Sequence, residues 1–473
     1  MPPILTQPAV PPPTGEPDPA LRCGTLQYTR ASLFTLCAWL IWGDFCFSLM
    51  ENVWPSILPL MLKREGASNF ILSLIVTTIP SIMNFVLNPI ISTASDRYRS
   101  PRGRRTPFLL FATPFATVLL ILLGFSQPIG HWLHTLLPGY SPQAIVLTTV
   151  GLLVIGFRFF ELFVNTVFWY LFNDVVPTAY MGRALGLFRV AGSLAGAAFN
   201  FFLFKHAETH TSAIFFGVAL LYGTMFFLMA LNVKEGSYPP PAPREAPGLS
   251  WWLHVKAFFK ECFSHRIYRL VFTYNALYYA ASVVNTFLLF LALSLGLTLE
   301  QFGFISGAAA LLSVLLMIPI GALIDRFNPI RLMLLAQLGC ALAYSVKLLF
   351  LFIDFPPSVA FWIFAAAVII VIPMTVANTM AGLPMLMRIF PRERFGQFCS
   401  ANAMCGAAGT VLGSLIASNL LDYSRPLFHA ANDSYRLIPL WSVLFTLLAV
   451  TFTWLVWREW QKLGGEHSYR PPR

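Results

Sequence analysis

Three carboxylates that could bind and release a cation, and one arginine that could pair with them, lie inside long apolar stretches of this sequence. Asp44 and Glu51 are seven residues apart in WGDFCFSLMENVWP, so a helix places both carboxylates on one face, about 10.5 Å apart. Arg158 and Glu161 have i,i+3 spacing and can pair on a second helix. A charge at the centre of a membrane helix costs on the order of 3 kcal/mol, so pairing or hydration must offset it.

The composition is typical of a polytopic membrane protein. Hydrophobic residues make up 57% of the 473 residues and charged residues only 11%, whereas soluble proteins have roughly 25% charged residues. The net charge of +11 comes from Lys and Arg between apolar runs, so we expect topology signals and no nucleic-acid partner. The seven cysteines show neither disulfide nor metal spacing. The phosphate-binding, nucleophile-elbow and zinc-protease motifs are absent, so we expect neither an enzyme nor a cofactor.

Twelve runs approach the twenty apolar residues that a membrane-spanning helix needs. They lie at about 31–62, 69–95, 107–126, 143–174, 184–205, 212–232, 267–296, 301–324, 330–353, 358–388, 397–421 and 437–458. We expect an all-α polytopic membrane protein with 12 transmembrane helices in two six-helix halves. The expected parts are a disordered tail (1–30), an N-terminal bundle (31–232), a central loop with an amphipathic surface helix (233–266), a C-terminal bundle (267–460) and a tail (461–473).

Lys and Arg gather in alternate connecting segments. With a cytosolic N-terminus, the outside segments contain only Lys63, Arg64, Lys205, Arg425 and Arg436. The positive-inside rule therefore predicts a multi-pass protein of the cell membrane with both termini in the cytosol.

The two halves carry matching sequence signals. STASDRYRSPRGRRTP follows the second span and GALIDRFNPIR the eighth, while PTAYMGR follows the fourth and PRERFGQ the tenth. Ten residues beyond the glycines of the latter pair are Gly192 and Gly406. The pattern predicts a six-plus-six internal repeat.

The loop SDRYRSPRGRRTP, Ser95 to Pro107, resembles the loop 2–3 signature of the major facilitator superfamily. In detail it is similar to plant sucrose transporters and, more distantly, to glycoside–pentoside–hexuronide cation symporters, whose early G-D resembles Gly43-Asp44 here. Ser92 departs from the signature, which opens with Gly. The resemblance implies the superfamily fold and secondary active transport by alternating access.

The resemblance also implies an inner gate latch whose ion pairs form only when the cytosolic side is closed. Its residues would be Asp96, Arg97, Arg104 and Arg105, with Asp325 and Arg326 in the second half. The alternative is that these arginines only set the orientation.

In the superfamily fold, spans 1, 4, 7 and 10 line a central cavity, where Asp44, Glu51, Arg158 and Glu161 would face one another. We interpret them as a cation-coupling site, with a structural ion-pair network as the alternative. A nearby arginine lowers the proton affinity of a desolvated carboxyl group, so moving Arg158 would load and release a proton. The sucrose-transporter analogy favours H⁺ over Na⁺. Asp44 is the favoured coupling carboxylate, and Glu51 is the alternative outer-gate or substrate residue.

Polar and aromatic residues on the same helices could bind a sugar through amide hydrogen bonds and aromatic faces. They are Asn165, Trp169, Tyr274, Asn275, Tyr278 and Asn378, and each could instead be a helix–helix contact. The hypothesis is a monomeric, cation-coupled symporter of a sugar or glycoside that works in the lipid bilayer. The alternatives are an exporter of amphipathic compounds, a lipid carrier on the same fold, and a sensor that does not transport.

Overall fold

The structure is a computed structural model that describes residues 21–238, 251–428 and 431–472. Among these residues, twelve helices are long and apolar enough to cross a membrane. They are Arg30–Arg64, Asn69–Arg97, Thr106–Gly124, Pro142–Val175, Met181–His206, Thr211–Asn232, Arg266–Ser294, Leu299–Ile324, Pro329–Phe352, Pro357–Ile389, Arg392–Tyr423 and Asp433–Lys462. The prediction of twelve spans is confirmed, and no predicted end differs from the observed one by more than five residues.

The six spans of the N-terminal half contain seven α-helices. They are α1 (Arg30–Arg64), α2 (Asn69–Ser73), α3 (Ile79–Arg97), α4 (Thr106–Gly124), α6 (Pro142–Val175), α7 (Met181–Ala198) and α8 (Thr211–Asn232). Single π-helical segments, Leu74–Thr78 and Phe199–Leu203, interrupt the second and fifth spans.

The six spans of the C-terminal half contain eight α-helices. They are α10 (Arg266–Ser282), α11 (Leu288–Ser294), α12 (Leu299–Arg326), α13 (Pro329–Lys347), α14 (Leu349–Phe352), α15 (Pro357–Ile389), α16 (Phe395–Tyr423) and α17 (Ile438–Lys462). Outside the spans lie β1 (Arg22–Cys23), β2 (Leu26–Gln27), α5 (Ser126–Leu136), α9 (Trp251–Cys262) and α18 (Gly465–Ser468).

Local side-chain chemistry sets where several helices begin. The hydroxyls of Thr29, Ser68, Ser141 and Thr298 accept hydrogen bonds from the third backbone N–H of α1, α2, α6 and α12. These caps satisfy N–H groups that have no partner within the helix. Each apolar run thus starts a helix at a defined residue.

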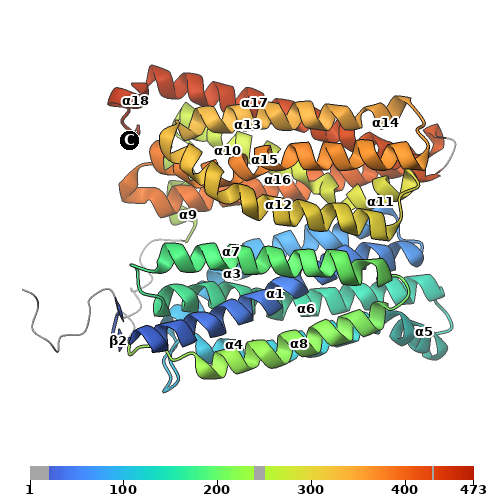
Figure 1. The fold of residues 1–473 in the computed structure, drawn as a ribbon, viewed down its shortest axis with the longest axis horizontal. Helices are drawn as coiled ribbons and strands as arrows, with labels where there is room; N and C mark the ends of the chain where they lie inside the picture. Colours follow the sequence, from blue (N-terminus) through green and yellow to red (C-terminus); the bar gives the residue numbers. More distant parts are fainter. Residues whose placement is uncertain (1–20, 239–250, 429–430, 473) are drawn as a thin grey trace, which may run out of the picture.

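The neighbours in the two halves correspond helix by helix. In the first half α1 packs against α7 and α8, α4 against α6 and α8, and α3 against α6. In the second half α10 packs against α16 and α17, α13 against α15 and α17, and α12 against α15. Each half is therefore one six-helix bundle with the same arrangement, and Figure 1 shows the two bundles side by side.

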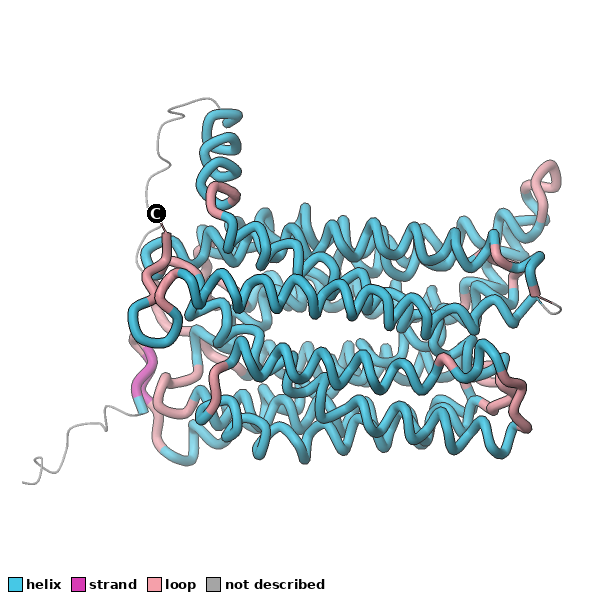
Figure 2. The backbone as a smooth tube through the Cα atoms, turned by 90° about the horizontal axis from the view of Figure 1, so that it is seen from above, coloured by secondary structure: helices cyan, strands magenta, loops and turns pink. Residues whose placement is uncertain are grey.

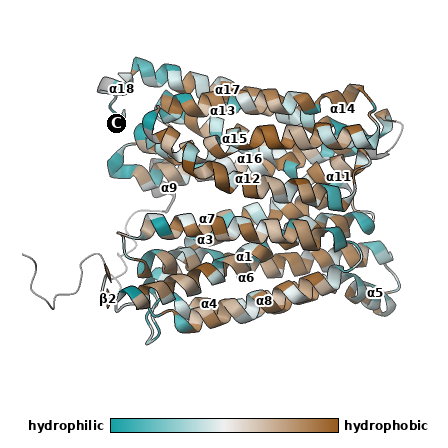
Figure 3. Cartoon of the chain, viewed as in Figure 1, coloured by the Kyte–Doolittle hydropathy of each residue, from teal (hydrophilic) through white to brown (hydrophobic). Residues whose placement is uncertain are grey.

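The outer surface of both bundles is apolar along the spans. Figure 3 shows hydrophobic residues along the helices and hydrophilic ones gathered at both ends. Large side chains such as Ile318, Leu342 and Leu315 are 83%, 73% and 71% exposed. A continuous apolar surface of this kind is stable only when lipid covers it, so this is a multi-pass membrane protein.

The described chain begins and ends at the same end of the bundles, which we call the terminal end; the other is the opposite end (Figure 1). The predicted disordered tail is wrong from residue 21 onward. Leu21 is buried, β1 pairs with β2, and the Tyr28 hydroxyl donates to the Val175 carbonyl at 3.0 Å. Residues 1–20 lie outside the described part of the chain. The amphipathic segment forms α9, which runs across the direction of the spans (Figure 2).

The two halves contact each other at the opposite end. The Asp422 carboxylate accepts hydrogen bonds from the backbone N–H groups of Asn69 and Phe70. Ser73 Oγ donates to the Ser414 carbonyl at 3.1 Å, and Thr78 Oγ1 lies 2.8 Å from Ser414 Oγ. Every hydrogen bond found between described residues of the two halves lies at this end.

Candidate coupling and gating site

One arginine and two carboxylates form an ion cluster between α1 and α6. Arg158 Nη1 lies 2.6 Å from Glu161 Oε2 and 3.5 Å from Glu51 Oε1. The Trp54 indole N–H donates to Glu51 Oε1 at 3.1 Å, and the guanidinium of Arg158 lies 5.1 Å from the centre of the Trp54 ring. Residues from two helices and from both sides of the arginine thus hold it in one position.

The charges in this cluster do not balance. Glu161 is completely buried, Arg158 is buried, and the Glu51 side chain is 32% exposed. With both carboxyl groups ionised, one arginine faces two negative charges at membrane depth. A single proton or monovalent cation would neutralise the surplus, and Glu51 is the member that solvent can reach.

Two further residues beside this cluster were not identified from the sequence, Tyr222 and Thr113. The Tyr222 side chain of α8 is completely buried near Glu161 and near Thr113 of α4, and neither hydroxyl has a hydrogen-bond partner among the described residues. A single hydroxyl inside an apolar run looks like an ordinary core residue. Only the packing of α8 against α1 and α4 reveals that the Tyr222 hydroxyl is near an acid.

Asp44 does not join this cluster, which corrects the prediction that it faces Arg158 and Glu161. Its carboxylate points toward α7: Oδ2 would lie 3.9 Å from a Cβ added at Gly192, and the nearby charged group is Arg189. Asp44 and Glu51 are seven positions apart, which separates them by two helical turns, and Arg158 lies at the level of Glu51.

The two predicted substrate residues of the first half lie on α6. Asn165 is half-buried and interacts with Glu161 one turn away. Trp169 is 37% exposed and its ring contacts Phe172 and Phe188 edge-on. Both lie on the stretch of α6 that leads from the ion cluster toward the terminal end.

The four predicted substrate residues of the second half take part in contacts between helices. Asn275 Nδ2 donates to the Asn402 carbonyl of α16 at 2.8 Å. Tyr274 and Asn378 are buried and interact with each other, and half-buried Tyr278 also interacts with Asn378. This network continues through two residues that the sequence did not single out: Gln337 donates to Asn378, and Thr453 donates to Gln337.

The arginine-rich loop is organised by an acid that sequence reasoning missed. Arg104 donates to both carboxylate oxygens of Asp174, through Nη2 to Oδ1 at 2.8 Å and through Nε to Oδ2 at 3.0 Å. Arg105 Nε also donates to Asp174 Oδ2, at 3.1 Å, while its Nη2 bonds Asp96. Burial disfavours the charge of Arg104, but the hydrogen bonds and charge of Asp174 outweigh it and raise the pKa. The two arginines thus share one carboxylate at the end of α6.

A second missed acid, Glu235, closes the same loop. Its carboxylate accepts hydrogen bonds from the backbone N–H groups of Arg104, Arg105 and Thr106, where α4 begins. Gly103 has a φ of +106°, and a Cβ there would lie 2.4 Å from Glu235 Cδ, so both backbone and space require glycine. Neither acid belongs to the sequence motif, so only the fold could identify them.

The predicted latch is therefore a set of pairs inside the first half. The Asp96 and Arg105 pair forms while the halves meet at the opposite end, so it does not require closure of the terminal end. Arg97 and Arg326 are exposed and form no ion pair with a described residue. The side chain of Asp325 lies outside the described part of the structure.

Comparisons with known proteins agree with this architecture. The sequence matches the Major Facilitator Superfamily over residues 4–200, 202–379 and 270–468. Solute carrier family 45 member 4 of Homo sapiens is 25% identical over 253 residues, which are 49% of this chain and 32% of that protein. The mouse protein of the same name is 25% identical over 211 residues, 42% of this chain and 26% of its own length. The matched segment is thus about a third or less of these relatives.

Solved structures share the fold at lower identity. A mutant of the nucleoside transporter NupG has a TM-score of 0.66 at 12% identity, covering 89% of this chain and 99% of its own. An inward-facing bacterial homologue of the human lysosomal transporter Spinster has a TM-score of 0.65 at 14% identity, with 92% and 99% covered. Twelve spans in two matching bundles and the family match over nearly the whole chain lead to one conclusion: this chain belongs to the Major Facilitator Superfamily.

Proposed function

We propose that this transporter is a cation-coupled symporter of a sugar or glycoside, that H⁺ is the coupling ion, and that it works as a monomer in the cell membrane. The observation that carries the proposal is the Glu51–Arg158–Glu161 cluster, which has one surplus negative charge at membrane depth. The other predicted functions give no reason for a cluster in which one carboxylate is solvent-accessible and the other is buried.

Alternating access requires two arrangements of the halves, and the contacts support one of them. The hydrogen bonds between the halves involve the ends of α2 and α16 at the opposite end. If the termini are cytosolic, as the distribution of Lys and Arg favours, this arrangement is closed to the outside. The second arrangement would break these bonds and close the terminal end.

The cluster couples a proton to this change through the position of Arg158. With Arg158 between the two acids, one carboxyl group remains without a full counter-charge, and it is most easily neutralised by a proton. A movement of α1 relative to α6 would alter the Glu51 distance while leaving the i,i+3 pair of Arg158 and Glu161 intact. The proton would be released when this movement takes Glu51 away, because Arg158 then neutralises Glu161 alone.

The assignment of a sugar rests on the chemistry of Asn165 and Trp169 and on the loop signature of the sucrose-transporter group. Asn165 supplies amide hydrogen bonds next to the cluster, and Trp169 exposes an indole face on the same helix. Sugars bind to such combinations of amides and aromatic faces. The second-half residues Tyr274, Asn275, Tyr278 and Asn378 would act by shaping the facing bundle.

The test is substrate-induced alkalinisation of a weakly buffered medium by cells that express the protein, over a panel of sugars and glycosides. We expect at least one to move protons inward, and Glu161→Gln to abolish accumulation while retaining exchange across the membrane. Sodium uptake without alkalinisation would replace H⁺ by Na⁺. Sugar accumulation that Glu51→Gln and Glu161→Gln leave unchanged would show that the cluster is structural. If the panel gives no flux while amphipathic compounds are exported, the symporter proposal fails.

A further inference from the structure

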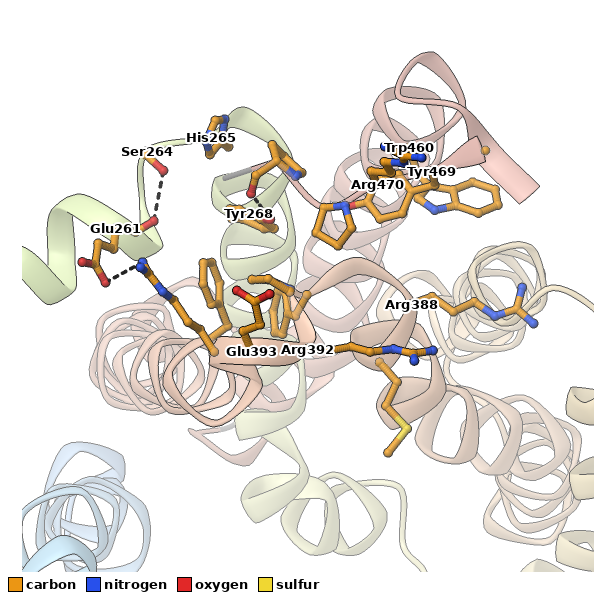
Figure 4. Close-up of a pocket in the computed structure, with 18 of the residues that line it drawn as sticks. Glu261, Ser264, His265, Tyr268, Arg388, Arg392, Glu393, Trp460, Tyr469 and Arg470 are labelled. Atoms are coloured by element: carbon orange, nitrogen blue, oxygen red, sulfur yellow. Dashed lines mark hydrogen bonds and ion pairs between the residues drawn. The ribbon is translucent and has the colours of Figure 1, made fainter. Parts of the chain in front are cut away.

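A large pocket lies at the terminal end of the C-terminal half, distant in the chain from the ion cluster of α1 and α6. Its volume is about 1190 Å³, and its walls come from the end of α9, the start of α10, the loop between α15 and α16, the end of α17 and the C-terminal segment. Figure 4 shows Arg388 in the last turn of α15, Arg392 in the segment that joins α15 to α16, and Arg470 beside Trp460 on the other wall. Every residue that lines it comes from residue 260 or later, so the ion cluster of the first half does not explain it.

The lining is positively charged. Five basic side chains face three acidic ones, which leaves two surplus positive charges. One acid is already engaged by an arginine, because Arg394 Nη1 lies 3.1 Å from Glu261 Oε2. Another, Glu466, accepts a hydrogen bond from Asn328 at 2.8 Å. Among the described residues, no acid forms an ion pair with the other basic side chains, which are Lys260, Arg388, Arg392 and Arg470.

The pocket also contains a buried hydrogen-bond donor without an acceptor. Trp460 is 2% exposed, and its indole N–H has no partner among the described residues. A buried donor without an acceptor is unfavourable, so an acceptor brought by a ligand would stabilise the complex. The basic residues alone could be explained as signals that set the membrane topology, but the Trp460 N–H cannot, so it is a second, independent sign of a ligand site.

The chain ties the pocket walls together, so the site is preformed. The Tyr268 hydroxyl of α10 donates to the Pro472 carbonyl at 2.7 Å. The Tyr469 hydroxyl donates to the Ile389 carbonyl at the end of α15, at 2.8 Å. These two bonds hold the C-terminal segment in place as one wall of the pocket. Arg388 and Arg392 lie on the opposite wall (Figure 4).

We propose that this pocket binds a phosphate-bearing ligand, either a phosphorylated lipid headgroup or a soluble phosphate ester. Free guanidinium groups match phosphate oxygens in geometry and charge, and a phosphate oxygen is the acceptor that the Trp460 N–H lacks. Exposed apolar side chains flank the basic loop: Met387 is 56% exposed and Phe259 of α9 is 44% exposed. Basic pockets between spans at a membrane surface hold anionic headgroups in this way, with the acyl chains on the apolar surface.

The experiment uses the full chain in nanodiscs of phosphatidylcholine, with or without phosphatidylinositol bisphosphate, and in detergent with inorganic phosphate or inositol trisphosphate. Native mass spectrometry counts bound lipid, and thermal unfolding reports affinity. Arg388→Gln/Arg392→Gln should weaken binding by about fivefold for each arginine, the effect of one basic residue near an anionic surface. The matched control is Arg266→Gln/Arg269→Gln, which removes equal charge from exposed positions at the same end outside the pocket.

Stabilisation only in nanodiscs that contain the phosphorylated lipid, lost in the pocket variant and kept in the control, assigns a lipid headgroup. Equal stabilisation by soluble inositol trisphosphate or phosphate assigns a soluble ester to the same site. Arg388→Lys/Arg392→Lys should keep part of the affinity. The part that remains is due to the positive charge, and the part that is lost is due to the paired N–H donors of the guanidinium. Equal losses in pocket and control variants, or no stabilisation by any of the three phosphate compounds, would overturn the proposal.

Discussion

The Asp422 carboxylate of the C-terminal half accepts a hydrogen bond from the backbone N–H of Asn69, at 3.1 Å, across the boundary between the halves. Its second oxygen accepts from Phe70 N–H at 2.9 Å, so one side chain from α16 caps the first turn of α2. Arg425 holds the same carboxylate from the other side, at 2.9 Å. These bonds exist only while the opposite end is closed, which makes them a lock on one arrangement of the halves.

Asp422→Ala should weaken this lock by about 1–3 kcal/mol, the range for charge-assisted bonds and lost caps. In a variant without other cysteines, Ser73→Cys reports opening, because Ser73 is buried between the halves. We expect its alkylation by a membrane-impermeant maleimide to become at least about fivefold faster, as an equilibrium shift of 1 kcal/mol implies. Glu300→Ala is the control, since its pair with Lys205 is exposed and long, at 3.8 Å. An unchanged rate in Asp422→Ala would show that other contacts hold the gate.

The stability of the C-terminal half depends on close contact between α10 and α16. A Cβ added at Gly409 would lie 2.1 Å from the Ala276 carbonyl oxygen, so the helices would have to separate. Gly409→Ala should therefore lower the free energy of unfolding by about 1–3 kcal/mol, the usual cost of overpacking. Gly382→Ala on α15 is the matched control, because nothing lies within 4 Å of the added Cβ. Thermal unfolding in detergent should separate the two, and equal melting temperatures would contradict the close contact.

Asp174 should matter more for stability than Asp96, although only Asp96 belongs to the loop motif. The Asp174 side chain is 12% exposed and holds both Arg104 and Arg105, whereas that of Asp96 is 51% exposed. Asp174→Asn removes the charged partner of the buried Arg105 guanidinium, which should lower the free energy of unfolding by about 1–3 kcal/mol. Asp96→Asn should cost less, because Arg105 keeps Asp174 and solvent screens the exposed pair. Thermal unfolding of the two variants is the measurement, and the reverse order would show that the motif acid organises the loop.

The thiol of Cys23 offers a separate measure of the Asp174 charge. Burial and, secondarily, Asp174 raise the pKa of Cys23, so less thiolate is present at any given pH. Its thiol also donates to the Asp174 backbone carbonyl at 3.3 Å. In a variant with Cys23 as the single cysteine, Asp174→Asn should lower this pKa and shift the pH profile of alkylation to lower pH. A profile that stays in place would mean that burial alone sets the pKa.

Asp44 and Glu161 should differ in what their loss changes. Asp44 is buried beside Arg189 on α7, away from the cluster, so we expect Asp44→Asn to lower thermal stability and keep uphill accumulation. Glu161→Gln should instead abolish accumulation at normal abundance. The accumulation ratio, normalised to protein at the membrane, separates the two roles. Loss of accumulation in Asp44→Asn with normal stability would return the coupling role to Asp44.

Much of the fold could be predicted because lipid imposes a simple pattern. A helix that crosses the bilayer must be apolar along its whole length, so all twelve spans were visible with their ends in place. The matched loops after spans 2 and 8, and the Gly192 and Gly406 positions, likewise revealed the repeat. Residues 21–29 were mispredicted because a Pro-rich segment resembles a disordered tail, and its packing of Leu21 and Tyr28 depends on distant residues.

The candidate site shows what the tertiary structure alone decided. The sequence by itself determined which charges lie at membrane depth, since any acid in an apolar run stands out, and the i,i+3 spacing paired Arg158 with Glu161. Only the packing of α1 on α6 chose Glu51 over Asp44 as the second acid. Which residues of two helices meet depends on how far the helices are shifted along their axes and how they are rotated. Neither quantity can be read from the local sequence. For the same reason Asp174, Glu235 and the phosphate pocket came to light only in three dimensions.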